Sequence, residues 1–186
     1  KADVNVNIWL NEKKRFADLF NGVLYKGKQV IRPEELEEIS PVASVSIKNR
    51  VGKTRNMKKY RDIVMRWKNN ATFVLLANES QDKVHYAMPH KVMLYDGMDY
   101  ETQIRNNWKN FNDRRKQNKK TGQPLEHLTA GEYLSRFRKK DRLIPIISLV
   151  FYYGSEPWDG PVDLYDMFRL EGTKEEKEIL EKYLPN

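Results

Sequence analysis

Two short, mainly apolar runs near the middle of the chain limit what it can fold into. YRDIVMRW occupies positions 60–67 and ATFVLLANES occupies positions 71–80, with only KNN between them. Alternation of apolar and polar side chains favours strands, and so short a polar turn makes consecutive strands pair antiparallel. We therefore expect a hairpin in which Asp62, near the start of one strand, and Glu79, at the end of the other, share one sheet edge.

Helical patterns flank this hairpin. Apolar residues at helical spacing follow Asn11, a candidate N-cap, and Gly27 is placed to end that helix. A T-x-x-E capping box opens each of the last two predicted helices, and LIPIISLVFYYG predicts a buried central strand. The expected order is helix 11–27, strand 42–48, strand 60–67, strand 71–80, helix 89–111, a helix from Thr129, strand 143–154 and a helix from Thr173.

Three connecting segments carry few apolar residues or mixed signals. KNRVGKTRNMKKYR at 48–61 and NDRRKQNKKTGQP at 112–124 are rich in Lys and Arg and predict basic loops. PEELEEI at 33–39 is compatible with a short helical turn or an extended piece. We expect one domain over residues 1–186, and the lack of a Met before Lys1 and the abrupt end at Asn186 suggest truncation at both ends.

Composition favours a polyanionic partner. The chain has 34 Lys and Arg against 26 Asp and Glu, a formal charge of +8, which attracts nucleic acid through its long-range field, although many basic proteins bind none. The absence of Cys excludes disulfides and thiolate metal sites and favours a cytoplasmic protein. Since the longest apolar run is well below the ~20 residues that span a bilayer, no membrane partner is expected.

Carboxylate chemistry remains once other sites are eliminated. The chain has three His and shows no G-x-S-x-G elbow or phosphate-binding Gly-rich loop. If Asp62 and Glu79 converge, their mutual repulsion is relieved by a hard cation such as Mg²⁺ or Mn²⁺, and Gln81, on the same strand face as Glu79, could orient a water. The alternative is that these acids are solvated strand ends. Asp18, Asn21 and Tyr25 likewise form a polar helix row that is either solvated or faces a site.

Four ordered blocks carry a family resemblance. RFADLFNGVLYKGKQVIRPEEL (15–36), YRDIVMRW (60–67), LLANESQDKVHYAMPHKVMLYDGMDY (75–100) and FRKKDRLIPIISLVFYYGSEPWDGP (137–161) resemble the recombination-promoting nuclease/transposase family of the PD-(D/E)XK nuclease superfamily. The resemblance covers roughly residues 11–170. It implies an α/β fold with a restriction-endonuclease-like α-β-β-β-α-β core, a mixed sheet flanked by helices.

The same resemblance implies a function: a Mg²⁺- or Mn²⁺-dependent DNA endonuclease, a hydrolase linked to transposition or recombination. Asp62 falls on the metal-binding Asp of the superfamily and Glu79 on the Glu of its E-x-K element, while Gln81 takes the Lys position. An E-x-Q pattern is common among close relatives, but it removes a cation and predicts weak activity unless Lys83 or Lys91 replaces that charge. Asp18 is a candidate accessory acid.

The basic segments supply candidate DNA contacts, since phosphates are met by Lys and Arg on loops and helix ends. The candidate nucleic-acid-binding residues are Lys53, Arg55, Lys58, Lys59, Arg114, Arg115 and Lys116. Two alternatives stay open. One is a catalytically silent DNA-binding module or transposase remnant. The other is a partner-binding protein, such as a homodimer, that uses Trp108 and Phe111 of the 89–111 helix; these two residues equally suit a core.

Overall fold

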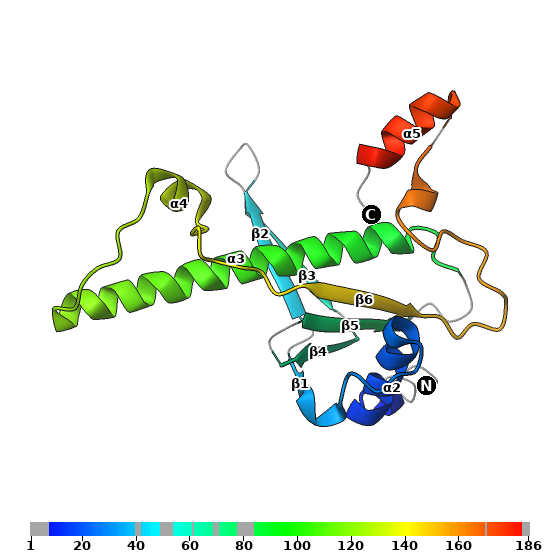
Figure 1. Cartoon of the computed structure of the whole chain (residues 1–186), viewed down its shortest axis with the longest axis horizontal. Coiled ribbons are helices and arrows are strands. Elements are labelled where there is room, and N and C mark those ends of the chain that lie inside the picture. Colours follow the sequence, from blue (N-terminus) through cyan, green and yellow to red (C-terminus); the bar gives the residue numbers. More distant parts are fainter. Residues whose placement is uncertain are drawn as a thin grey trace.

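A computed structural model describes residues 8–39, 42–48, 54–60, 62–68, 71–77, 84–169 and 171–183, with backbone alone for 42–48, 54–60 and 74–77. Within these ranges the protein is a mixed α/β structure (Figure 1). Its helices are α2 (Lys13–Tyr25), α3 (Met88–Thr121), α4 (Ala130–Ser135) and α5 (Lys174–Tyr183), and short 3-10 turns occupy Pro33–Glu35 and Tyr165–Met167. Its strands are β1 (Leu36–Glu38), β2 (Val42–Lys48), β3 (Thr54–Tyr60), β4 (Ile63–Trp67), β5 (Ala71–Ala77) and β6 (Ile146–Phe151).

The larger sheet has four strands in the order β1-β4-β5-β6. β4 pairs antiparallel with both β1 and β5, whereas β6 runs parallel to β5. The β4–β5 register runs from Ile63 opposite Leu75 to Trp67 opposite Ala71, so the predicted hairpin is confirmed. A parallel neighbour needs a long crossover, and the segment containing α3 supplies it.

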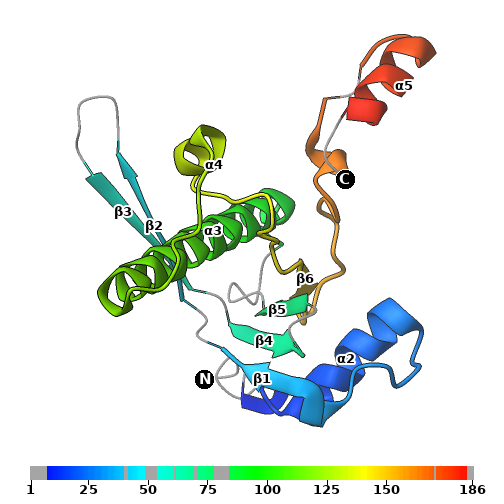
Figure 2. The same cartoon turned by 60° about the vertical axis from the view of Figure 1, so that its left-hand side comes forward.

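Helices cover the two faces of this sheet. Figures 1 and 2 show α2 on one face and α3 on the other. On the α2 side, Phe16 and Phe20 pack with Met65 and Phe73 in a buried core. On the opposite side, Val64 packs with Tyr95 of α3. Successive residues of β4 thus enter different cores, as the period-two alternation of the sequence predicts.

The smaller sheet corrects the expectation for 48–61. Much of that range is β3, which pairs antiparallel with β2 from Val42 opposite Tyr60 to Lys48 opposite Thr54, and the hairpin packs against α3. The basic loop prediction was therefore wrong for residues 54–60. Without an apolar alternation TRNMKKY carries little strand signal, and pairing of the backbone with β2 decides its structure.

α3 corrects the expectation for 112–124. The helix begins at Met88, as predicted to within one residue, but it continues to Thr121 instead of ending near Phe111. Arg, Lys and Gln are good helix formers, and Lys119 and Lys120 in the last turn complement the negative C-terminal end of the helix dipole. The first Gly or Pro after Phe111 is Gly122, which adopts a left-handed conformation at φ 71° and ends the helix.

Two further predictions need adjustment. β6 lies at one end of the four-stranded order, and Val150 is 37% exposed, so 143–154 holds an edge strand rather than a central one. Its apolar sequence reflects packing on both faces, because Ile147 joins the α2-side core and Ile146 the α3-side core. In α2, the N-cap position is Glu12 and no side chain caps it, so the predicted Asn11 cap was wrong.

Candidate functional site

The candidate catalytic edge lies where β4 begins and β5 ends. Asp62 directly precedes β4 and is half-buried. Ile63 is opposite Leu75. Asp62 therefore lies close to the C-terminal end of β5, whose final described residue is Ala77. Glu79 follows Ala77 by two positions in the sequence. The pairing and register on which the Asp62–Glu79 prediction depends are therefore present.

The other predicted site residues fall into two groups. Glu79, Gln81 and Lys83 lie outside the described residues, so their predicted convergence with Asp62 stays a prediction. Lys91 is half-buried in the first turns of α3, where its ammonium nitrogen lies 5.7 Å from the centroid of the Tyr95 ring. Asp18 is exposed on α2.

The predicted nucleic-acid-binding residues also divide. Lys53 lies outside the described residues, and Arg55, Lys58 and Lys59 belong to β3, where the backbone alone is described. Arg114, Arg115 and Lys116 are exposed on the second half of α3. These three side chains are thus carried on a helix rather than on the loop that their composition predicts.

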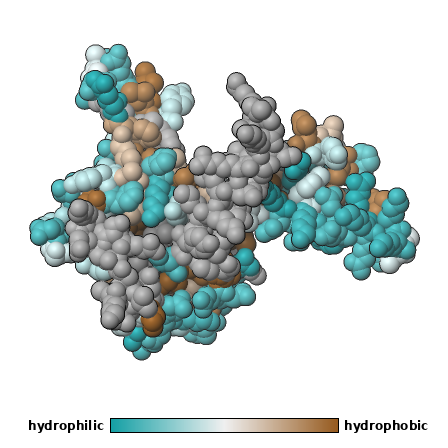
Figure 3. Space-filling view, turned by 180° about the vertical axis from the view of Figure 1, so that it is seen from behind, coloured by the Kyte–Doolittle hydropathy of each residue, from teal (hydrophilic) through white to brown (hydrophobic). Residues whose placement is uncertain are grey.

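Residues 105–142 hold the whole net charge of the chain. They contain twelve Lys or Arg against four Asp or Glu, a net charge of +8, and the remaining residues contain twenty-two of each. We call this region the arm: it comprises the second half of α3, α4 and the segments around α4. Figure 1 shows the arm extending beyond the sheet, and Figure 3 shows its surface from behind as mostly hydrophilic. The arm is therefore strongly basic, as is the segment 48–61, which has seven Lys or Arg and no acid.

Arg138 forms a buried ion pair within the returning segment of the arm and packs this segment on Phe111 of α3. The side chain of Arg138 is only 8% exposed and donates to Asp141 at 2.6 Å and to Glu126 at 3.4 Å. Its guanidinium also lies 4.6 Å from the centroid of the buried Phe111 ring. Hydrogen bonding to Arg138 holds the pKa of Asp141 below its usual value. Arg138 therefore has a structural role. Phe111 is a core residue, which is one of the two roles predicted for it.

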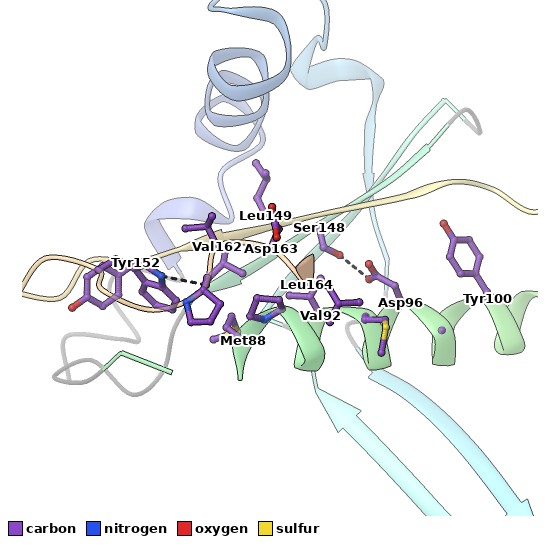
Figure 4. Close-up of a pocket in the computed structure, with 16 residues that line it drawn as sticks. Met88, Val92, Asp96, Tyr100, Ser148, Leu149, Tyr152, Val162, Asp163 and Leu164 are labelled. Atoms are coloured by element: carbon purple, nitrogen blue, oxygen red, sulfur yellow. Dashed lines mark hydrogen bonds between the residues drawn. The ribbon is translucent and has the colours of Figure 1, made fainter. Parts of the chain in front are cut away.

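A pocket that the sequence did not predict lies between α3, β6 and the loop around Trp158 (Figure 4). Its volume is about 710 Å³, within the range of small-molecule sites. Most of its walls are apolar, and the hydroxyl of Ser148 donates to the carboxylate of Asp96 at 2.8 Å on its wall. The signal that could have indicated it is Ser148, the one polar residue in LIPIISLVF.

The described residues contain neither a cluster of metal ligands nor a membrane-spanning helix. Within those residues no three or more His, Asp or Glu side chains gather in a way that could hold a metal ion. Of the two predicted metal-binding carboxylates, Asp62 alone lies within the described residues. No helix in the described ranges combines the length and apolar character needed to cross a bilayer.

Comparison of the chain with protein-family models, with curated proteins and with solved structures found no match.

Proposed function

We propose that the chain is a divalent-metal-dependent DNA endonuclease with a restriction-endonuclease-like core. The order of elements supports this fold. α2 is followed by the antiparallel strands β1, β4 and β5, then by α3 and by β6 parallel to β5. This is an α-β-β-β-α-β sequence of elements, with the β2–β3 hairpin inserted between β1 and β4. The order is the one that the resemblance to the PD-(D/E)XK superfamily implies.

The observation that carries the proposal is the register of β4 with β5. It aligns Ile63 with Leu75. The start of β4, which Asp62 precedes, is therefore at the same edge of the sheet as the end of β5, which Glu79 follows in the sequence. Two carboxylates brought to one edge suit Mg²⁺ or Mn²⁺, which prefer oxygen ligands. In the proposed site Asp62 and Glu79 hold the cation, and Gln81 orients a water.

The chain's own groups account for the rest of the proposed chemistry. A bound divalent cation supplies a water of lowered pKa and neutralises charge on a phosphate. Gln81 can accept a hydrogen bond from the attacking water but cannot contribute the positive charge of a Lys. Of the two predicted replacements for that charge, Lys91 lies within the described residues, and its ammonium lies over Tyr95. We therefore expect slow hydrolysis of the phosphodiester.

The test is metal-dependent nicking of supercoiled plasmid. Asp62→Ala and Glu79→Ala are each expected to reduce nicking by at least about 100-fold, because each removes a metal ligand. Gln81→Lys is expected to increase nicking, since it restores a cation at the position of the superfamily Lys. Glu156→Ala removes an exposed carboxylate and serves as the matched control, and urea unfolding verifies that every variant is folded.

Unchanged nicking by Asp62→Ala and Glu79→Ala would contradict the proposal. A different result, DNA binding by the folded wild-type protein with no nicking in Mg²⁺ or Mn²⁺, would favour the second candidate, a catalytically silent DNA-binding module. The concentration of the net charge in the arm supports DNA binding in both cases, because neutralising phosphates releases counterions whether or not the DNA is then cut.

A further inference from the structure

A second hollow lies between the projecting half of α3 and the end of α4. Its volume is about 400 Å³. Four cationic side chains line it: Arg105, Lys109, Lys116 and Arg136. The acids in its lining are Glu101 and Asp113. The hollow is thus a positively charged concavity within the arm, separate from the candidate catalytic edge.

The two acids pair with two of the four cations. Glu101 accepts from Arg105 at 2.8 Å, and Asp113 lies 3.6 Å from Lys116. Both pairs are exposed, and such pairs contribute little and exchange readily. Within the described residues, Lys109 and Arg136 make no hydrogen bond or ion pair through their side chains. Their charges remain available to an anionic ligand.

One aromatic ring lines the hollow and a second ring contacts it. The indole of Trp108 lines the hollow, and the ring of Tyr133 meets it edge-on at a centroid distance of 6.2 Å. Tyr133 is 68% exposed. An exposed Tyr contributes nothing to a core, but its face can stack on a nucleobase. Proteins bind single-stranded nucleic acid by stacking bases on aromatic rings and holding the backbone phosphates with nearby cations.

The backbone at Arg136 supplies an independent observation. Arg136 is the C-cap residue of α4 and adopts a left-handed conformation with φ 55°. Gly is the usual residue at such a helix end, because a Cβ atom is disfavoured there. The chain instead places an exposed Arg at this position, with its side chain in the lining of the hollow. Lys26 and Lys68 also have positive φ, but of these three residues Arg136 is the one that lines the hollow.

We propose that the hollow between α3 and α4 binds single-stranded DNA, with a base stacked on the exposed ring of Tyr133 next to Trp108 and adjacent phosphates held by Lys109 and Arg136. An unpaired base can reach these rings, whereas a duplex presents stacked bases and outward phosphates. The inference rests on the proposed function only in taking DNA as the partner. It requires neither a metal ion nor cleavage.

The first test is the affinity for a fluorescently labelled oligothymidylate, measured by anisotropy with EDTA present so that cleavage does not interfere. Tyr133→Ala is expected to weaken binding by about 5-fold or more, the loss typical of one stacked base, whereas Tyr133→Phe keeps the ring and most of the affinity. Tyr183→Ala, which removes an equally exposed Tyr from α5, is the matched control and is expected to bind normally.

The second test separates the side chain of Arg136 from its backbone. Arg136→Gly removes the cation while placing the preferred residue at a left-handed position, so the fold is retained. Lys26→Gly makes the same change at another exposed helix C-cap, with φ 53°. Arg136→Gly is expected to weaken oligothymidylate binding and to lower the salt slope of log K by about 0.7, the value for one phosphate contact on a single strand. Lys26→Gly is expected to leave both unchanged.

Several outcomes would overturn the inference. They are equal or tighter binding of a duplex of the same length, tighter binding of oligouridylate than of oligothymidylate, and equal effects of Arg136→Gly and Lys26→Gly. The nicking assay is read separately. Oligothymidylate binding that depends on Tyr133 and Arg136, in a protein that nicks no plasmid, would support this site and contradict only the proposed nuclease.

Discussion

At the scale of single residues, Asn21 has a clear role that its position in a helix does not reveal. It is completely buried in α2. Its amide nitrogen donates to the carbonyl of Ile31 at 2.8 Å, and its carbonyl oxygen accepts from the backbone N–H groups of Ile31 at 2.8 Å and Val30 at 3.1 Å. Asn21 thus replaces a strand partner for the segment that leads from α2 to β1.

Asn21→Ala is expected to lower the free energy of unfolding by about 2–4 kcal/mol, because it leaves buried backbone groups of Ile31 unpaired and creates a cavity. Urea unfolding monitored by Trp fluorescence measures the change. Asn106→Ala is the matched control: Asn106 is an exposed residue within α3, and its substitution is expected to change stability by no more than about 0.5 kcal/mol. A similar loss in both variants would contradict the structural role of Asn21.

The candidate site shows which residue-level features can be predicted from sequence. The position of Asp62 at the sheet edge where β5 ends follows from two apolar runs and a short turn, which are local signals. The burial of Asn21 depends on where residues 29–31 fold back onto α2. The position of the Arg136 side chain depends on the left-handed conformation of that one residue. Neither arises from periodicity, so the polar row of Asp18, Asn21 and Tyr25 left both its interpretations open.

At the scale of elements, the two capping boxes followed the sequence most closely. The predicted capping box of α4 is present: Thr129 accepts from the N–H of Glu132, and the Glu132 carboxylate accepts from the N–H of Thr129 at 2.9 Å. The second box, Thr173 with Glu176, has the same reciprocal bonds. These contacts span three residues, so no tertiary packing is needed to establish them.

The box at Glu132 makes the stability of the arm pH-dependent. Backbone hydrogen bonds from Thr129 and Lys139 lower the pKa of Glu132 to about 2. Since the folded pKa lies below the unfolded value of about 4.3, the stabilisation is complete above that value and is lost as the pH falls towards 2. We expect Glu132→Gln to have a lower urea midpoint than the wild type at pH 7 and nearly the same midpoint near pH 2.

The control for this prediction is Glu156→Gln, which changes an exposed carboxyl outside either capping box. Its midpoint is expected to follow that of the wild type at every pH. A constant difference between wild type and Glu132→Gln across the whole range would mean that the carboxylate charge of Glu132 does not matter to the cap.

Longer elements were predicted less well, for physical reasons that differ. β3 has no apolar alternation, and its strand form depends on pairing with β2. The second half of α3 has no apolar stripe, so its helix depends on intrinsic propensity and on continuity with the part that packs on the sheet. β6 has the apolar content of a central strand, yet the order of strands in the sheet, a tertiary property, places it at an edge.

At the scale of the whole molecule, charge is segregated. The arm has a net charge of +8 and the segment 48–61 a net charge of +7, and an excess of acids in the remaining residues offsets the second of these. A count along the sequence can find this imbalance, but the composition of residues 112–124 predicts a loop. The long α3 makes the difference, because it carries Arg114, Arg115, Lys119 and Lys120 on one rigid element that extends past the sheet (Figure 1).

Two variants with the same net charge test this segregation. The arm variant replaces four cations of α3 by Gln and lowers the net charge from +8 to +4: Arg114, Arg115, Lys119 and Lys120. The second variant makes the same change in net charge at Lys13, Lys14, Lys26 and Lys28. The arm variant is expected to lower the salt slope of duplex DNA binding by about 3 to 4, on the basis of 0.9 per phosphate contact. The second variant is expected to bind like the wild type. Equal slopes in the two variants would show that only total charge matters.

The continuity of α3 has a consequence for the length of any polymer that contacts both ends of the protein. Thirty-four helical residues span about 50 Å at 1.5 Å per residue, which corresponds to roughly 15 base pairs of B-form DNA. A flexible linker would allow many distances between the two ends of the protein, whereas an unbroken helix holds them at one distance. Affinity should then rise as a step, rather than gradually, once the polymer becomes long enough to reach from one end of α3 to the other.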